Sequence, residues 1–316
     1  MTQNLDNMAS VALGYLAAGK GAALATVIST WGSAPRPKGA QLAISEEGEF
    51  QGSVSGGCVE GAVILAAQDA IRDGKCRVLE YGIADEDAFA VGLACGGDIQ
   101  ILVEPIGVGD GPDKQLLEDA VEAAKTRQPF AYHVNLNSWS RERVDPNGLT
   151  TGKQGDVFTY VANPNLRMIV VGAVHVTQTL APLARMAGYD VLLVDPRDSF
   201  ATKARFPDES FIDAWPDEAL TQVGLDAHTA VITLSHDPKI DTPALAVALK
   251  SDVFYIGSLG SNKTHAKRVL ELQGQGFSDT DIARIHGPIG LNIGSKTPAE
   301  IAISIMAEVT ERLRRS

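Results

Sequence analysis

The second half of the chain alternates short apolar stretches with amphipathic ones in a regular order. Strands that alternate with helices favour a parallel sheet covered on both faces. We therefore predict a Rossmann-like, parallel-sheet carboxy-terminal domain over residues 163–316, with two more helices near 262–274 and 298–314. The expected elements before these are strand 168–171, helix 176–187, strand 191–194, a helix near 217–223, strand 229–234, helix 242–250 and strand 253–256.

The first half has short strands joined by glycine-rich bends. Helical spacing of apolar residues predicts a helix from about Val59 to Asp73, which ends at Gly74 as a C-terminal cap should. A helix near 114–126 and polar strands up to Val161 are also expected. We predict an α+β amino-terminal domain over residues 1–162, so that the whole chain is a two-domain α/β protein, as its 316 residues suggest. Strands are expected at 22–29, 40–44, 76–81 and 98–104.

Charge and cysteine usage narrow the functional classes. The net charge of −12 opposes general attraction to nucleic acid or anionic lipid. The sequence contains no run of 18 uncharged apolar residues, so we expect no membrane span. It has no basic stretch before its first apolar residues, so we expect no signal peptide. Cys58, Cys76 and Cys95 all lie in the first third and do not suggest a disulfide framework. We expect a cytoplasmic protein with reduced thiols and without nucleic-acid or membrane partners.

The bend SVSGGCVE (residues 53–60) runs directly into the first expected helix. The backbone N–H groups of Gly56, Gly57 and Cys58 would then lie at a helix amino terminus, which favours anions and lowers a thiol pKa. Glycines there leave room for a ligand to approach the backbone. A tight turn that carries an inert cysteine is the alternative, and the local sequence does not decide between the two.

A second cysteine–glycine bend, GLACGGD (residues 92–98), precedes a strand and contains Cys95, Gly96 and Gly97. A soft metal such as molybdenum, or the sulfur atoms that hold it, would suit a thiolate neighbourhood. Without nearby histidines or CxxC spacing, the two thiols do not indicate a zinc site. Cys76 begins an apolar strand and is expected in the core.

The loop TWGSAPRPKG (residues 30–39) places two prolines around an arginine. Such a rigid loop could hold Arg36 and Lys38 against a phosphate or an oxo group. An ordinary solvated turn would have the same sequence.

Several of these stretches together resemble one protein family. TWGSAPRPKGA, GSVSGGCVEGAV, YGIADEDAF and GLACGGDIQILVEP occur in this order between residues 30 and 105, and VDPRDSFATKARFP, TLSHDP, FYIGSLGSNKTHAKR and IHGPIGLNIGSKTPAEIAISI follow. They resemble the XdhC/CoxI family over nearly the whole chain except about 107–162. The resemblance implies an accessory protein that binds and protects the molybdenum cofactor, assists its sulfuration with a cysteine desulfurase, and inserts it into an apo molybdenum hydroxylase such as xanthine dehydrogenase.

The resemblance also implies a site. The cofactor, as molybdopterin or its cytosine dinucleotide form, would have molybdenum or its sulfur near Cys58 and Cys95. A maturation chaperone is implied rather than a catalyst, and a homodimer is left open. The expected cofactor-binding residues are Arg36, Lys38, Ser55, Gly56, Gly57, Cys58, Glu60, Cys95, Gly96, Gly97, Gly172, His175, Asp195, His236, Asp237, Gly257 and His265.

The Rossmann-like half carries an incomplete dinucleotide fingerprint. Gly172 follows the first strand, and Asp195, 23 positions later, stands where a ribose-binding acid is expected. Val174 and Thr177 occupy the second and third glycine positions, so close approach of a pyrophosphate is disfavoured. Binding of NAD(P) is therefore doubtful.

Polar residues nevertheless follow several strands of this half, at the edge where an open α/β sheet binds its ligand. They are His175, Asp195 with Arg197, Ser235-His236-Asp237, and Gly257-Ser258. The helix that begins after Gly260 adds Lys263, His265, Lys267 and Arg268, which could supply local positive potential or could simply form an exposed amphipathic helix.

Two other functions compete with the chaperone hypothesis. An NAD(P)-dependent oxidoreductase would use the Rossmann-like half, but Val174 and the lack of a recognisable catalytic constellation oppose it. A docking protein that recruits a desulfurase without touching the cofactor would leave both cysteine bends without a purpose.

Overall fold

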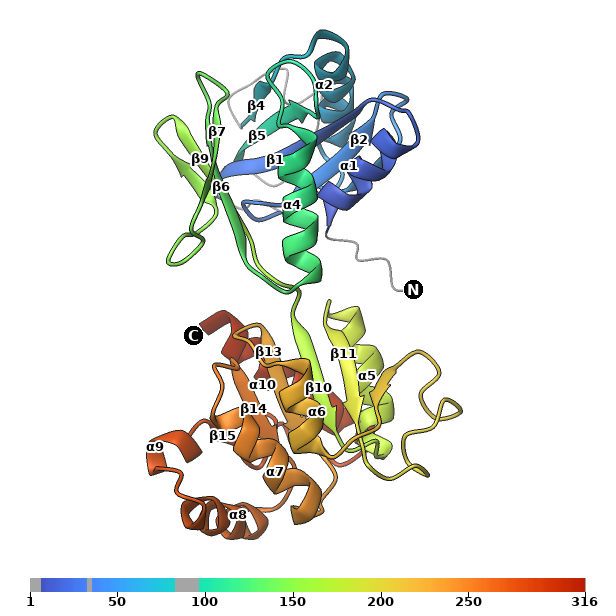
Figure 1. The fold of residues 1–316 in the computed structure, drawn as a ribbon, viewed down its shortest axis with the longest axis vertical. Coiled ribbons are helices and arrows are strands. Elements are labelled where there is room, and N and C mark those ends of the chain that lie inside the picture. Colours follow the sequence, from blue (N-terminus) through green and yellow to red (C-terminus); the bar gives the residue numbers. More distant parts are fainter. Residues whose placement is uncertain (1–6, 33–35, 83–96, 316) are drawn as a thin grey trace. The chain divides into compact units, whose positions relative to one another are not determined.

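The computed structural model describes residues 7–32, 36–82 and 97–315. The chain divides into two compact units, Met1–Pro164 and Asn165–Ser316, each with its own sheets and core (Figure 1). Within the described residues, no helix is long and apolar enough to cross a membrane.

A five-stranded antiparallel sheet forms the centre of the first unit, with strand order β3-β2-β1-β5-β4. Its middle strand is β1 (Ala22–Trp31), which is buried from Ala22 to Ile28. The elements around it are α1 (Met8–Ala17), β2 (Gln41–Ser45), β3 (Phe50–Gly52), α2 (Glu60–Asp73), β4 (Arg77–Tyr81), β5 (Asp98–Pro105) and α4 (Lys114–Lys125).

Both faces of this sheet are covered by helices. Successive side chains of a strand point to opposite faces, so neighbouring residues of β1 belong to different core clusters. Ala23, Ala25 and Val27 belong to a core cluster completed by the buried residues of α2. Leu24 lies in a second cluster, with residues of α1 and α4.

A second antiparallel sheet, in the order β7-β6-β9-β8, packs against the first around Ile28, Leu102 and Phe130. A buried ion pair joins the two sheets, with Arg141 Nη2 2.6 Å from Glu104 Oε1. Glu104 is 1% exposed, so this contact fixes how β7 and β5 lie against each other. The strands are β6 (Phe130–Asn135), β7 (Arg141–Val144), β8 (Gly152–Gln154) and β9 (Val157–Ala162).

The second unit is a six-stranded parallel sheet in the order β12-β11-β10-β13-β14-β15. Numbered from its first strand, this is the 3-2-1-4-5-6 order of the Rossmann fold. The elements are β10 (Arg167–Val171), α5 (His175–Met186), β11 (Asp190–Val194), β12 (Ser210–Ile212), α6 (Pro216–Val223), β13 (Thr229–Thr233), α7 (Pro238–Leu249), β14 (Tyr255–Ser258), α8 (Asn262–Gly274), α9 (Asp279–Ile282), β15 (Ile285–His286) and α10 (Pro298–Arg315).

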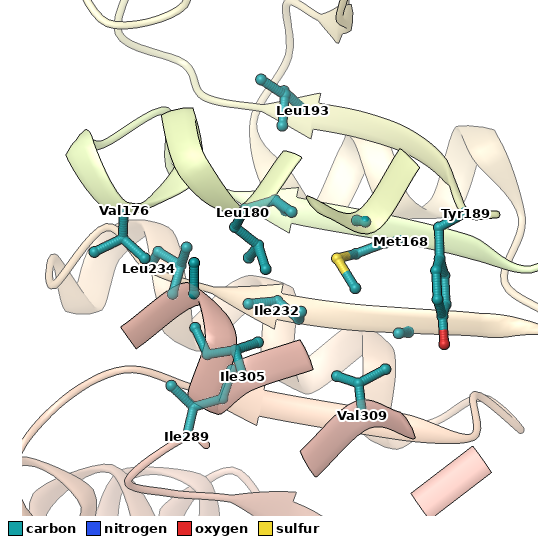
Figure 2. Packing of buried hydrophobic residues seen from close by; sticks show 14 of the residues in the cluster. Met168, Val176, Leu180, Tyr189, Leu193, Ile232, Leu234, Ile289, Ile305 and Val309 are labelled. Carbon is teal, nitrogen blue, oxygen red and sulfur yellow. The ribbon is translucent and has the colours of Figure 1, made fainter. Parts of the chain in front are cut away.

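Helices cover both faces of this sheet. Met168 and Ile232 pack with side chains of α5 and α10, as Figure 2 shows for Leu180, Ile305 and Val309. The opposite face packs against side chains of α6, α7 and α8 in a second cluster.

The predicted fold class, an α+β unit followed by a Rossmann-like parallel sheet, is confirmed. Helices α1 and α9 and the short strands β3, β12 and β15 were not predicted from the sequence. Strands of two or three residues are too short to show a period of two, and their positions depend on the neighbouring strand.

Candidate functional site

The bend before α2 folds around the carboxylate of Glu60. Oxygen Oε1 accepts hydrogen bonds from Ser53 Oγ (2.7 Å) and from the amides of Val54 (3.2 Å) and Ser55 (2.9 Å). Oxygen Oε2 accepts from Ser55 Oγ and from the amide of Gly57 (2.9 Å). The bend is therefore closed by an acceptor supplied from the first turn of its own helix.

This environment keeps Glu60 ionised. Burial alone would raise the pKa of its carboxyl, but the hydrogen bonds from Ser55 and Ser53 outweigh burial and bring the pKa to about 2. The amide of Gly56 is also used within the bend, donating to Ser53 Oγ (2.9 Å). The amides of Gly56 and Gly57, expected to face a ligand anion, thus have acceptors inside the protein, and their cofactor role stays a prediction.

Cys58 is a free, half-buried thiol two residues before α2. It packs against the core cluster beneath α2. From the second bend, Cys95 and Gly96 lie outside the described residues, while Gly97 is buried directly before β5. Whether Cys58 and Cys95 come together stays a prediction.

Arg36 and Lys38 line a common cavity of about 270 Å³ beside this bend. Arg36 Nε donates to the carbonyl of Ser53 (3.3 Å), which links the cavity to the bend closed by Glu60. In the described part of the chain, no carboxylate pairs with either cation. The remaining lining residues are Met8, Pro37, Gly39, Ala40, Gln41, Gly52, Thr151, Tyr160 and Val161.

Polar residues that were not predicted from the sequence also line this cavity, among them Gln41 and Tyr160. Gln41 is 8% exposed and accepts a hydrogen bond from Tyr160 OH (3.2 Å), which positions both side chains. Tyr160 belongs to β9, in the region that showed no resemblance. Only the packing of the second sheet against the first brings Tyr160 to Gln41, so no local signal could have found it.

The thiol of Cys76 is buried and does not line this cavity. It is 7% exposed and lies against Arg141 and Glu104, and burial raises the pKa of its thiol to about 12. The placement of Cys76 in the core is confirmed.

In the second unit, the carboxylate of Asp195 is bonded to neighbouring protein groups and does not face solvent. Its carboxylate accepts a hydrogen bond from the amide of Ala173 (2.7 Å) and pairs with Arg197, whose Nε and Nη2 lie at 2.8 and 2.7 Å. These groups occupy both oxygens of a carboxylate whose residue is 2% exposed. Asp195 thus fastens the end of β11 to the loop after β10 and has little capacity left for a ribose.

The structure explains why residue 172 is a glycine. It adopts φ = +110°, and a Cβ there would lie 2.7 Å from the amide nitrogen of Ser235. The glycine therefore allows the loops after β10 and β13 to approach each other. Val174 follows as the N-cap residue of α5 and supplies no capping hydrogen bond.

The loop after β13 contains the predicted site residues His236 and Asp237, whose surroundings differ. His236 is exposed and has φ = +64°. Asp237 caps α7 by accepting from the amide of Lys239 (3.0 Å). Ser235 Oγ donates to Asp241 (2.6 Å), a 1% exposed carboxylate that the sequence analysis did not single out.

At the carboxyl edge of the sheet, Arg197 lies near the carboxylates of Asp195, Asp237 and Asp241. The hydrogen bonds with Asp195 raise the pKa of Arg197, and the charges of Asp237 and Asp241 add to this effect.

Among the described residues, the other predicted site residues of this unit are not hydrogen-bonded to that group. His175 is exposed at the start of α5, and in the described residues no hydrogen bond joins it to another predicted site residue. Gly257 is buried within β14 against Ile289. His265 lies near Arg268 on α8, and burial, aided by Arg268, lowers its pKa.

Fold and site together define a two-unit protein in which an α+β unit with an arginine–lysine cavity precedes a Rossmann-type sheet without a complete dinucleotide fingerprint. The model of the XdhC and CoxI family matches residues 15–82, and the model of the XdhC Rossmann domain matches residues 168–309. The molybdenum cofactor insertion chaperone PaoD of Escherichia coli is 30% identical over 98% of this chain and 89% of that protein. The chain belongs to the XdhC and CoxI family.

A further relative and a solved structure are also similar to this chain. A Bacillus subtilis protein, described as a probable xanthine dehydrogenase component, is 27% identical over 93% of this chain and 94% of that protein. A crystal structure described as a xanthine dehydrogenase from Bacillus halodurans has the same fold, with a TM-score of 0.79 at 24% identity over 98% of this chain and 96% of that one.

Proposed function

We propose that this chain binds the molybdenum cofactor and inserts it into an apo molybdenum hydroxylase. The observation that carries the proposal is the similarity to a molybdenum cofactor insertion chaperone, which extends over 98% of this chain and includes both units. The family membership supports a maturation role more than an oxidoreductase, and the internal bonds of Asp195 give NAD(P) no obvious ribose partner.

The cavity of the first unit fits an anionic part of such a cofactor. Arg36 and Lys38 face it without a paired carboxylate among the described residues, and guanidinium and ammonium groups are suited to phosphate. The neighbouring bend is already filled by Glu60, so these two side chains are the groups we assign to the phosphate. When bound, the cofactor supplies molybdenum chemistry to its client enzyme, and Cys58 and Cys95 are proposed to lie near the metal or its sulfur.

The finer parts of the proposal concern partners and compartment. A cysteine desulfurase is proposed as the sulfur source, and the cytoplasm as the compartment. The free thiols of Cys58 and Cys76 suit a reducing environment. Molybdopterin and its cytosine dinucleotide form both remain candidates for the bound species.

The proposal is tested by producing the protein together with an active cofactor pathway and measuring bound molybdenum after gel filtration. The protein should also restore activity to an apo molybdenum hydroxylase. We expect the Arg36→Gln/Lys38→Gln double variant to lose most of the bound metal and Cys58→Ala to lose part of it. The control Arg72→Gln/Lys114→Gln removes the same charge from side chains that are 75% and 56% exposed, and should retain the metal. Wild-type protein that neither retains molybdenum nor restores activity would refute the proposal.

A further inference from the structure

A histidine at the carboxyl edge of the second unit is held by a buried carboxylate. His286 ends β15, and its Nδ1 lies 3.0 Å from Oε1 of Glu308, a 9% exposed residue of α10. The other oxygen of Glu308 accepts hydrogen bonds from Tyr255 OH (2.6 Å) and the amide of Gly290 (2.7 Å). The Tyr255 ring also stacks on the imidazole, with centroids 4.8 Å apart and planes at 17°. The ring of His286 is thereby fixed in both position and tilt.

The carboxylate also decides which nitrogen is available. Burial alone would raise the pKa of Glu308, but the hydrogen bonds from His286 and Tyr255 outweigh burial and bring the pKa to about 2. An ionised carboxylate only accepts, so Nδ1 of His286 carries the hydrogen, and a neutral ring keeps its lone pair on Nε2. Among the described residues, no hydrogen bond reaches Nε2, and it is not one of the buried unpartnered atoms. The side chain is 20% exposed and Nε2 is not buried, so a neutral ring would offer Nε2 as a fixed acceptor to a ligand.

The loop that follows His286 lies against buried polar groups of α8 and α7. A Cβ on Gly287 would lie 2.3 Å from Nδ1 of His265, so a glycine is needed where α8 approaches this edge. Nδ1 of His265 and Nη1 of Arg268 are buried without a hydrogen bond in the described part of the chain, and Oδ2 of Asp241 also accepts none but forms an ion pair with Nη2 of Arg268 at 3.8 Å. Buried polar groups of α7 and α8 therefore lie against the loops that follow β13 and β15, at the edge where open α/β sheets bind ligands.

We infer that Nε2 of His286 accepts a hydrogen bond from an N–H or O–H group of the ligand bound by this unit, and that Glu308 is its positioning residue. The inference rests on the proposed function, in which the whole chain serves cofactor insertion, and the ligand to be tested on this unit is therefore the molybdenum cofactor. Its pterin carries amino and ring N–H groups, and the dinucleotide form adds ribose hydroxyls and the cytosine amino group. A purely structural network would not require the imidazole, because Tyr255 and Gly290 already tie Glu308 to the sheet and to the loop after β15.

Matched substitutions in the full-length protein separate the two nitrogens of the ring. His286→Asn keeps an N–H near the position of Nδ1 and removes Nε2, whereas His286→Gln places a polar atom near Nε2. Affinity is measured with molybdopterin and with its cytosine dinucleotide form, each released from a donor protein, and thermal unfolding is recorded in parallel. We expect His286→Asn to bind at least tenfold more weakly at an unchanged unfolding temperature, and His286→Gln to recover part of the affinity.

The two cofactor forms locate the donor. Weaker binding of both forms assigns the donor to the pterin, and weaker binding of the dinucleotide form alone assigns it to the nucleotide. Nitrogen NMR of the wild-type ring should show Nδ1 protonated and Nε2 shifted by ligand, while Glu308→Gln should give mixed tautomers and an intermediate loss of affinity. Unchanged affinity of His286→Asn for both forms would overturn the inference and leave the proposed function standing. Wild-type protein that binds neither form would overturn both.

Discussion

Two bends of this protein, one in each unit, enclose a carboxylate of their own but balance its charge differently. Glu60 accepts five hydrogen bonds from residues 53–57, and among the described residues no cation pairs with it. Asp195 accepts two amide hydrogen bonds, from Ala173 of another loop and from Arg197, and is neutralised by the Arg197 side chain. The first arrangement is local and relies on dipoles, and the second connects separate strands and relies on an ion pair.

The difference bears on where a ligand anion can bind. The bend around Glu60 retains a full negative charge and has its inner donors occupied, so it repels a second anion unless nearby cations compensate. Arg36 and Lys38 are the cations placed beside it. At the Rossmann edge, the Asp195–Arg197 pair adds no net charge, and recognition there depends on hydrogen bonds instead.

Truncation of Glu60 should have the largest effect. Glu60→Ala leaves the amides of Val54, Ser55 and Gly57 without their acceptor, and unpaired buried donors are costly. We expect a loss of about 3 kcal/mol in the free energy of unfolding, measured with urea. Glu60→Gln should lose less because the amide oxygen still accepts. An equal loss for both variants would show that charge, and not the bonding of the bend, is decisive.

Acid should weaken the first bend. The folded pKa of Glu60, about 2, lies below its usual value of 4.5, so its stabilising contribution is complete above about pH 4.5 and is lost as the pH falls toward 2. Unfolding free energies at pH 5 and pH 3 should therefore differ more for the wild type than for Glu60→Gln. Glu308 contributes in the same direction, so Glu60→Gln removes only part of the slope. Glu122→Gln, at a 66% exposed side chain, should keep the wild-type slope.

The second bend should respond more weakly to loss of charge. Asp195→Asn keeps an oxygen for the amide of Ala173 but weakens the bond with Arg197, whose side chain is 29% exposed and can turn to solvent. We expect a loss of about 1 kcal/mol by urea unfolding. A loss as large as that of Glu60→Ala would contradict the proposed contrast between the bends.

The smallest expected effect is that of added dinucleotides. Val174 adds a side chain where the fingerprint requires bare backbone, and Asp195 is already bonded. Calorimetry with NAD, NADP and their reduced forms should show no binding in the micromolar range. A micromolar dissociation constant for any of them would mean that the loop after β10 opens and releases Asp195.

The sequence predicted more of the fold than of the site. The alternation after residue 164 located the parallel sheet because each strand and helix there is long enough to show its period. The helix that ends at Gly74 was found because its apolar spacing and its C-terminal cap agree, and Gly74 has φ = +71°. In contrast, Asp241, Tyr160 and Glu308 gave no signal, since their partners lie in other elements.

The sequence by itself determined which side chains follow each predicted strand and helix, and with them the alternation typical of a Rossmann-like sheet and the cysteine-bearing bend before α2. Only the tertiary structure decided which of these side chains have capacity left for a ligand. Glu60 and Asp195 are polar residues at expected positions, yet their oxygens are bonded within the protein, whereas no hydrogen bond among the described residues reaches Nε2 of His286. The physical reason is that a hydrogen-bonding group is used up by whichever partner the fold brings within about 3 Å, and that partner is often distant in sequence.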